Sequence, residues 1–241
     1  MGQVRRQYLL LTRVVWDIMK GIHGFHRVQS CVAVFGSARL TDERAPLYQA
    51  ARDLGVLLGR NKITVMTGGG PGLMEAVCKG VRAAGGRCIG CRISLSLKQA
   101  ENRYLDRWVT FRYFFVRKVM LLRHSRALVV LPGGLGTLDE LFEVLTLIQT
   151  RTIAPLPIAF LGRDYWQPVL NVLQQMVTAG TISANEMSHV MSQVLVSDSV
   201  DEVLQHLKSN SAQVPKPTRT MLVGAGPSSE DPAESTSAIS A

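Results

Sequence analysis

The feature that most constrains the fold of this chain is an alternation of short apolar runs with segments of helical periodicity. Between residues 31 and 208, runs such as CVAVF, ITVMT and ALVVL are each followed by a glycine-bearing turn and a helix-like pattern. Strands that alternate with helices in this way favour a parallel sheet built from right-handed crossovers. The runs lack polar alternation, which is typical of strands buried on both faces. We therefore predict an α/β fold, a doubly wound, Rossmann-like parallel sheet in a single domain over residues 28–208.

The two ends of the chain differ from this central region. Residues 1–27 have the pattern of an amphipathic basic helix and lack the unbroken apolar core and cleavage site of a signal peptide. Residues 209–241 are rich in Ser, Pro and Ala and are predicted to be disordered, because they cannot bury enough surface to offset their ordering entropy. No apolar run reaches the roughly 18 residues that span a membrane. We expect a cytoplasmic protein without a membrane partner.

The cysteines and the charge limit the possible chemistry. The four cysteines are too few for a disulfide scaffold, so we expect a reduced chain. Cys88 and Cys91 have CxxC spacing but no second ligand pair, which favours a buried strand over a zinc site. The net charge is +9, yet the arginines are scattered and no stacking aromatics are interleaved with them. We predict no metal, no organic cofactor and no nucleic-acid partner.

Three glycine-bearing turns fall where predicted strands end and helices begin. In an open α/β sheet, ligands bind beyond the carboxyl ends of the strands. The free N–H groups and positive end of a helix favour an anion there, and glycine lets the backbone approach phosphate oxygens. The predicted phosphate-binding residues are Gly36, Ser37, Gly69, Gly70, Gly72, Gly133, Gly134, Gly136 and Thr137. The turns lack the lysine of a P-loop and the glycine spacing of a dinucleotide fingerprint, which argues against a triphosphate or NAD.

Three longer motifs then carry a family resemblance. They are PGGLGTLDE at 132–140, GGGPGLMEA at 68–76 and FRYFFVRKVML at 111–121. Together they resemble the LONELY GUY family of cytokinin riboside 5'-monophosphate phosphoribohydrolases, in its longer bacterial branch, also called lysine decarboxylase-like. The resemblance covers about residues 31–207. It implies hydrolysis of the N-glycosidic bond of N6-substituted adenosine 5'-monophosphates, which releases the free base and ribose 5-phosphate.

The resemblance also implies roles for three charged residues. Glu140 matches the catalytic carboxylate of the family and supplies negative charge near an oxocarbenium-like transition state. Arg117 matches its catalytic partner, a fork-shaped donor for phosphate or ribose oxygens. Lys118 is expected to bind phosphate. Because adjacent helical residues point about 100° apart, Lys118 and Arg117 cannot reach one atom, and one of them is free to serve a neighbouring subunit.

Further substrate contacts are expected near these residues, and each has a structural alternative. They are Arg39, Met74, Glu75, Glu101, Asp139 and Thr146. Met74 also fits a hydrophobic core, while Glu75 and Asp139 also fit carboxylates that complement a helix N-terminus. The alternative function is a non-catalytic carrier of the same fold, for a nucleotide or the molybdenum cofactor. The combination of Glu140 with Arg117 favours the enzyme, because a carrier does not need it.

The helix predicted around residues 111–125 bears on the oligomeric state. Its apolar residues lie almost all round the helix, so a sheet surface on one side cannot bury them all. We therefore predict a homodimer or a larger homo-oligomer with this helix at or near the interface. The expected small-molecule partner is a nucleoside 5'-monophosphate.

Overall fold

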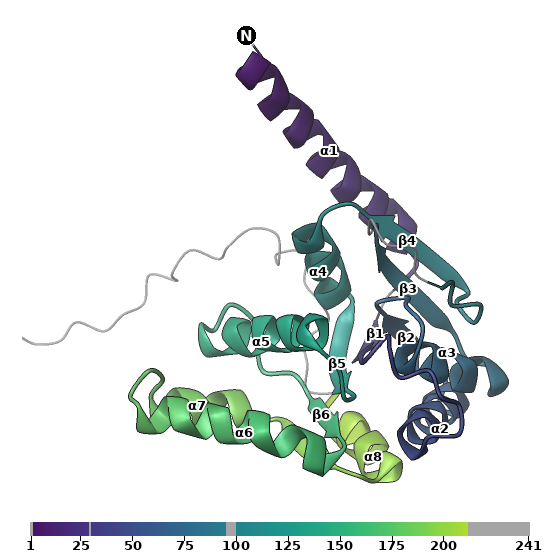
Figure 1. Cartoon of the computed structure of the whole chain (residues 1–241), viewed down its shortest axis with the longest axis vertical. Helices are drawn as coiled ribbons and strands as arrows, with labels where there is room; N and C mark the ends of the chain where they lie inside the picture. The colour runs from purple at the N-terminus through teal and green to yellow at the C-terminus, as the bar shows by residue number, and fades with distance from the viewer. Residues whose placement is uncertain (1, 29, 95–99, 212–241) are drawn as a thin grey trace, which may run out of the picture.

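A seven-stranded parallel sheet forms the centre of the molecule, shown in Figure 1 for the computed structural model, which describes residues 2–28, 30–94 and 100–211. The strands are β1 (Cys31–Phe35), β2 (Val65–Thr67), β3 (Cys88–Ile93), β4 (Arg107–Phe111), β5 (Ser125–Val130), β6 (Ile158–Leu161) and β7 (Val194–Ser197). The helices of the described part are α1 (Gly2–Phe25), α2 (Pro46–Arg60), α3 (Leu73–Ala83), α4 (Phe114–Arg123), α5 (Leu135–Gln149), α6 (Arg163–Thr178), α7 (Ala184–Met191) and α8 (Val200–Ser211).

The strand order is β4-β3-β2-β1-β5-β6-β7, and each neighbouring pair is parallel. The chain builds one half of the sheet outward from β1, returns to the centre at β5 and builds the other half. This confirms the predicted doubly wound α/β fold. The order reverses between β1 and β5, and this switch point is where open α/β sheets bind their ligands.

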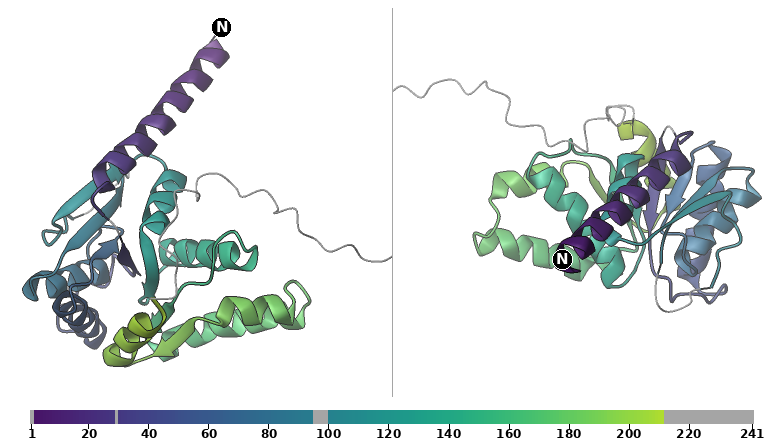
Figure 2. Two further views of the ribbon diagram at one scale, coloured as in Figure 1. Left: turned by 180° about the vertical axis from the view of Figure 1, so that it is seen from behind. Right: turned by 90° about the horizontal axis from the view of Figure 1, so that it is seen from above.

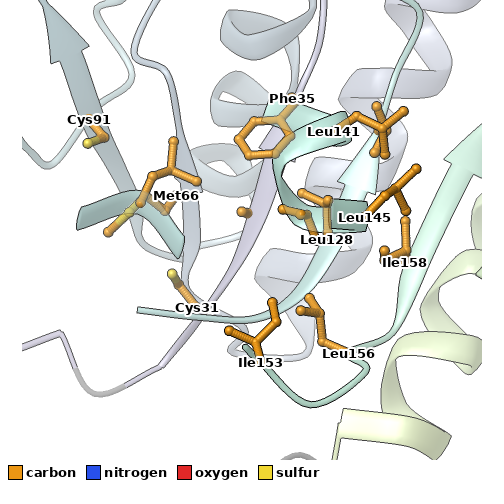
Figure 3. Close-up of a cluster of buried hydrophobic side chains, with 14 of the residues drawn as sticks. Cys31, Phe35, Met66, Cys91, Leu128, Leu141, Leu145, Ile153, Leu156 and Ile158 are labelled. Atoms are coloured by element: carbon orange, nitrogen blue, oxygen red, sulfur yellow. The ribbon is translucent and has the colours of Figure 1, made fainter. Parts of the chain in front are cut away.

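The strands of the sheet bury both of their faces. On β1, Ala33 and Phe35 join the core under α4, α5 and α6, whereas Val32 and Val34 join the core under α2, α3 and α8. Figure 3 shows the first of these cores, where Phe35 lies beside side chains of β5 and α5. Burial on both faces explains why the strand sequences carry no polar alternation.

Helices α2 and α3 approach each other closely because each has a glycine at the contact. A Cβ on Gly55 would lie 2.1 Å from the carbonyl oxygen of Val77, and one on Gly80 would lie 2.0 Å from that of Arg52. The two backbones are therefore in direct contact, and any side chain at either glycine would separate the helices.

The cysteines correct one prediction and confirm another. Cys78 of α3 and Cys88 of β3 form a disulfide, so the expectation of a fully reduced chain was wrong for this pair. The helix and strand lie in adjacent layers of one α/β unit, which brings the two side chains together although the sequence pattern does not show it. Cys91 is buried and free on the same strand, as predicted for a buried strand segment.

Helix α1 projects away from the sheet, as Figures 1 and 2 show from three directions. Its C-terminal half is anchored through Asp17, whose side chain is fully buried. The Asp17 carboxylate accepts hydrogen bonds from the backbone N–H groups of Arg112 (2.5 Å) and Tyr113 (3.3 Å) and from Lys20 Nζ (3.0 Å). Because Tyr113 is the N-cap residue of α4, Asp17 satisfies the start of the helix that carries Arg117.

The charge of Asp17 suits this anchoring position. Burial alone would raise the pKa of Asp17, but the Arg112 N–H and the Lys20 ammonium together hold the pKa below its ordinary value. Asp17 is therefore an ionised carboxylate that links α1 to the start of α4.

The structure also bears on the predictions about membrane spans and about the C-terminal boundary of the domain. Among the described residues, no helix has the length and apolar character needed to cross a lipid bilayer. Helix α8 continues to Ser211, three residues beyond the predicted domain end at 208. The rest of the predicted disordered tail, residues 212–241, lies outside the described residues.

Candidate active site

A cavity of about 730 Å³ opens at the carboxyl ends of β1 and β5, at the switch point of the sheet. It is lined by Phe35, Gly36, Ser37, Ala38, Arg39, Leu40, Gly68, Met74, Arg117, Pro132, Gly133, Gly134, Leu135, Gly136, Thr137, Glu140 and Tyr165. The structure thus brings together most of the residues that the sequence predicts for substrate binding. They come from the first and third glycine turns and from α3, α4 and α5.

The third glycine turn and the start of α5 form one wall of this cavity. Gly134 is the N-cap of α5, so the N–H groups of Leu135 and Gly136 begin the helix without a carbonyl partner inside it. A Cβ added to Gly134 or Gly136 would meet no atom within 4 Å, whereas one on Gly133 would lie 2.1 Å from Thr137 Oγ1. The turn therefore holds Thr137 against Gly133 and leaves open space beside the free N–H groups, where an anion is favoured.

Arg117 and Glu140 line the cavity together and form an ion pair. Arg117 Nη1 lies 3.4 Å from Glu140 Oε1, and Arg117 Nε donates to the carbonyl oxygen of Cys91 at 2.9 Å. A Cβ on Gly68 would lie 2.5 Å from Arg117 Nη2, so the absence of a side chain at Gly68 makes room for the guanidinium. Gly68 was not among the predicted site residues, although it opens the second glycine turn.

Glu140 is a buried carboxylate with only 5% of its surface exposed. Burial raises the pKa of Glu140 to about 7, against the lowering effect of the Arg117 charge, while the nearby Glu143 raises it further. An acid with a pKa near neutrality is suited to exchanging protons with a substrate or water at physiological pH. Glu140 is therefore a buried carboxylate with a pKa near neutrality that also forms an ion pair with Arg117.

Lys118, Asp139 and Thr146 lie outside this cavity. Lys118 Nζ is 3.2 Å from Asp139 Oδ1 and 3.3 Å from Glu143 Oε2. Burial opposes the charge of Lys118, but its bonds to these two carboxylates raise its pKa above the ordinary value. Thr146 donates to the carbonyl oxygen of Phe142. Lys118, Asp139 and Thr146 line a separate groove along α5, so their predicted substrate contacts stay predictions.

The second glycine turn supports the first turn more than it lines the cavity. Gly72 has a φ of +70°, and a Cβ there would lie 2.5 Å from the carbonyl oxygen of Ser37, which also accepts the N–H of Leu73 at 3.0 Å. Gly69 also has a φ of +70° and packs against the side chain of Arg92. Gly70 accepts a hydrogen bond from Asn102. Of the predicted residues on this turn and the helix after it, Met74 lines the cavity.

The remaining predicted contacts and one unpredicted residue complete the picture. Glu75 is half-buried in the first turn of α3, where burial and the charge of Glu43 raise its pKa, and it is not among the cavity-lining residues. Glu101 is exposed and lies outside the lining as well. Tyr165 of α6 was not predicted, yet it lines the cavity and donates from Oη to the carbonyl oxygen of Gly133 at 2.6 Å. Its position just after β6, at the same edge of the sheet, is the signal that could have identified it.

Metal ligands were also sought among the residues that the structure describes. In that part of the chain no three His, Cys, Asp or Glu side chains are grouped so that they could hold a metal ion. The groups that line the cavity and could take part in chemistry include the Arg117–Glu140 pair, the Arg39 guanidinium, the backbone N–H groups of α5 and the hydroxyls of Ser37, Thr137 and Tyr165.

Comparison with known families places this site in context. A family model described as "Possible lysine decarboxylase" matches residues 74–207, a range that contains both Arg117 and Glu140. The chain belongs to this family. Its sequence relatives include plant enzymes, and the assignment to the longer bacterial branch stays a prediction.

Two plant proteins represent these relatives. A cytokinin riboside 5'-monophosphate phosphoribohydrolase of Arabidopsis thaliana is 33% identical over 153 residues, which cover 62% of this chain and 71% of the relative. A probable enzyme of the same name from Oryza sativa subsp. japonica is 32% identical over 169 residues, covering 69% and 73% of the two chains. The resemblance to the LONELY GUY family is therefore confirmed.

Solved structures share the fold at lower identity. The molybdenum cofactor binding protein from the phototrophic bacterium Rippkaea orientalis is 22% identical, with a TM-score of 0.53 over 75% of this chain and 96% of that one. The Moco carrier protein from Chlamydomonas reinhardtii is 19% identical, with a TM-score of 0.53 over 77% and 99% of the two chains. At these identities the likeness shows the fold alone.

Proposed function

We propose that this protein hydrolyses the N-glycosidic bond of adenosine 5'-monophosphates, including N6-substituted ones, to the free base and ribose 5-phosphate. The observation that carries the proposal is the buried Arg117–Glu140 pair, which faces a cavity whose wall is a glycine turn and a helix N-terminus. The names of the plant relatives support the same reaction. The cavity volume of 730 Å³ suits a nucleotide, since small-molecule sites span roughly 300–1,000 Å³.

Each part of the cavity has a task in this reaction. The free N–H groups at the start of α5 and the Thr137 hydroxyl bind the 5'-phosphate, because both donate to anionic oxygens. The Glu140 carboxylate stabilises positive charge that develops on the ribose and takes a proton from the attacking water. Arg117 holds Glu140 in place and donates to ribose or phosphate oxygens.

The atoms of the proposed step balance without a cofactor. The oxygen of water forms a bond to the anomeric carbon of the ribose while the bond from that carbon to the base nitrogen breaks. The proton removed from water by Glu140 is returned to the departing base, and ribose 5-phosphate is left with a hydroxyl at its anomeric carbon. Glu140 is ionised in a useful fraction at neutral pH because its pKa is about 7.

The direct test is incubation of the full chain with AMP and with isopentenyladenosine monophosphate, followed by chromatography for the free base. We expect base release from at least one nucleotide and poor release from adenosine, because the anion site supplies much of the binding. Equal cleavage of adenosine and AMP would contradict the phosphate site. Nucleotide binding without any base release would favour a carrier instead of an enzyme.

We also propose that the active form is a homodimer or a larger homo-oligomer. Phe114 and Phe115 of α4 are 51% and 53% exposed, and Leu135 at the start of α5 is 85% exposed. These side chains give the surface beside the cavity an apolar character, which a second copy would bury. Light scattering at micromolar concentration should report at least twice the chain mass of 26.4 kDa. A monomer with full activity would rule this out.

A further inference from the structure

A second cavity, of about 470 Å³, lies at the opposite, amino-terminal edge of the sheet. It is lined by Arg27, Val28, Ser30, Cys31, Val32, Lys62, Ile63, Thr64, Arg87, Ile89, Arg126, Ala127, Leu207 and Lys208. None of these residues lines the candidate active site. Five of them are arginine or lysine and none is aspartate or glutamate, so the lining is strongly cationic.

These cations reach the cavity from five separate parts of the fold. They follow α1 (Arg27), end the turn after α2 (Lys62), precede β3 (Arg87), lie in β5 (Arg126) and lie on α8 (Lys208). Among the described residues, none of the five forms an ion pair with an acidic side chain. Like charges gathered without partners repel one another, and a bound anion removes that repulsion.

The local geometry of β5 directs Arg126 into this cluster. Cys31 of β1 pairs with Ser125, but Val32 pairs with Ala127, so Arg126 is an extra residue in a β-bulge. Bulges change the direction of a side chain and are enriched next to binding sites. Arg126 Nε is buried and has no hydrogen-bond partner among the described residues. Because buried donors are nearly always paired, the bulge leaves Arg126 a donor without its acceptor.

Lys62 adds a second unusual backbone position at the same cavity. Its φ is +56°, a left-handed conformation that residues other than glycine seldom adopt. In this conformation the chain turns sharply from α2 toward β2, which places Lys62 on the cavity wall. Ser30 and Thr64 also line the cavity, and their hydroxyl groups can act as neutral donors.

We propose that this cavity binds a small polyvalent anion with two or more linked phosphate groups. Five cationic side chains and two hydroxyl-bearing residues around 470 Å³ match several phosphate groups better than one, since a single phosphate group carries about two negative charges and would leave most of the five positive charges uncompensated. Guanidinium groups suit the purpose because their fork of donors fits phosphate oxygens. The site is separate from the proposed glycosidase reaction and stands independently of it.

The test is isothermal titration of sodium tripolyphosphate, and of orthophosphate, into the full chain. We expect tripolyphosphate to bind more tightly than orthophosphate, and we expect its affinity to fall as salt is added. Arg126→Gln should weaken tripolyphosphate binding about tenfold or more, because it removes a charge-assisted hydrogen bond. The matched control is Arg6→Gln, which removes the same charge from the projecting part of α1 and should change affinity less than twofold.

Two further variants locate the binding and guard against misfolding. Thr137→Val alters the candidate active site and should leave tripolyphosphate affinity unchanged, whereas a loss there would place the anion in the catalytic cavity and overturn the proposal. Arg87 and Lys208 are exposed, so the double variant Arg87→Gln, Lys208→Gln should fold normally and still bind at least tenfold more weakly. An affinity equal to that of Arg6→Gln in this variant would also overturn the proposal.

Discussion

The two edges of the sheet offer anions very different surroundings. At the carboxyl edge, the cavity is lined by the backbone N–H groups at the start of α5, three hydroxyl-bearing side chains and two arginines, Arg39 and Arg117, and a buried carboxylate lies among them. At the amino edge, five cationic side chains surround the cavity without a carboxylate in its lining. The first arrangement can hold an anion and still place negative charge beside it. The second can bind an anion but has no carboxylate to place beside it. The edge with the carboxylate is therefore the one suited to glycosidic chemistry.

Glu140→Gln is the substitution expected to affect the carboxyl edge most while it leaves the amino edge unchanged. We expect base release to fall by roughly 10² or more, as for removal of an acid–base group, with nucleotide affinity within a few-fold of wild type. Single-turnover assays and a binding titration would separate the two quantities. Tripolyphosphate binding at the amino edge should be unaffected. Retained base release would remove Glu140 from the mechanism.

The same variant should show what the buried carboxylate costs in stability. The pKa of Glu140 in the folded protein is about 7, above its ordinary value of 4.5. The folded state therefore favours the protonated side chain, and the stability that Glu140 contributes is fully present below about pH 4.5 and is lost as pH rises through 7. Relative to wild type, Glu140→Gln should therefore gain stability between pH 4.5 and pH 8, by at most about 3 kcal/mol. Urea unfolding at both pH values measures the change. A difference that stays constant with pH would contradict a raised pKa.

Arg117→Gln tests the role of the Arg117–Glu140 ion pair. The Arg117 charge lowers the pKa of Glu140, so its removal should move the rising limb of the activity profile to higher pH. At pH 7 we expect base release to fall roughly tenfold or more, because a charge-assisted hydrogen bond is also lost. Arg123→Gln, at the end of the same helix and outside the cavity lining, is the matched control. A variant whose pH profile is unshifted would show that the two charges are not coupled.

Gly133 and Gly136, at the third glycine turn and the start of α5, give a smaller but specific test of the proposed phosphate site. Gly136→Ala adds a methyl group in open space, so the protein should fold at least as stably while nucleotide affinity falls about tenfold. Gly133→Ala puts the methyl group against Thr137 and should instead destabilise the fold by about 1–3 kcal/mol. Thermal melts and nucleotide titrations on both variants compare the effects. Unchanged affinity in Gly136→Ala would remove the helix N-terminus from the phosphate site.

Much of the fold could be predicted because its signals are local. Continuous apolar runs specify strands buried on both faces, and glycines after them mark the turns at the carboxyl edge. Helix α7 (Ala184–Met191) was not predicted, since it is short and lies inside a long connection between α6 and β7. The Ser183–Glu186 capping box fixes the start of this helix, and the sequence carries this signal at residues 183–186.

The site could be predicted less completely than the fold. Arg117 and Glu140 lie close together as the motifs implied, because each follows a strand that ends at the same edge. The pairing of Lys118 with Asp139 and Glu143, and the disulfide of Cys78 with Cys88, depend on how separate elements pack. The position of Arg126 depends on a register shift between β1 and β5. Such contacts could not be predicted, because the residue pattern within one segment carries no information on how separate segments pack.

The anchoring of α1 has a mechanical consequence for the reaction. Asp17 holds the backbone N–H of Tyr113, and the carbonyl oxygen of Tyr113 in turn accepts the N–H of Arg117 at 3.1 Å. The projecting half of α1 (Figure 1) is thus connected through Asp17 to the first turn of α4, so a force on that half of the helix acts on this turn. A displacement of the projecting half of α1 that draws Asp17 away would release the start of α4 and loosen the guanidinium beside Glu140.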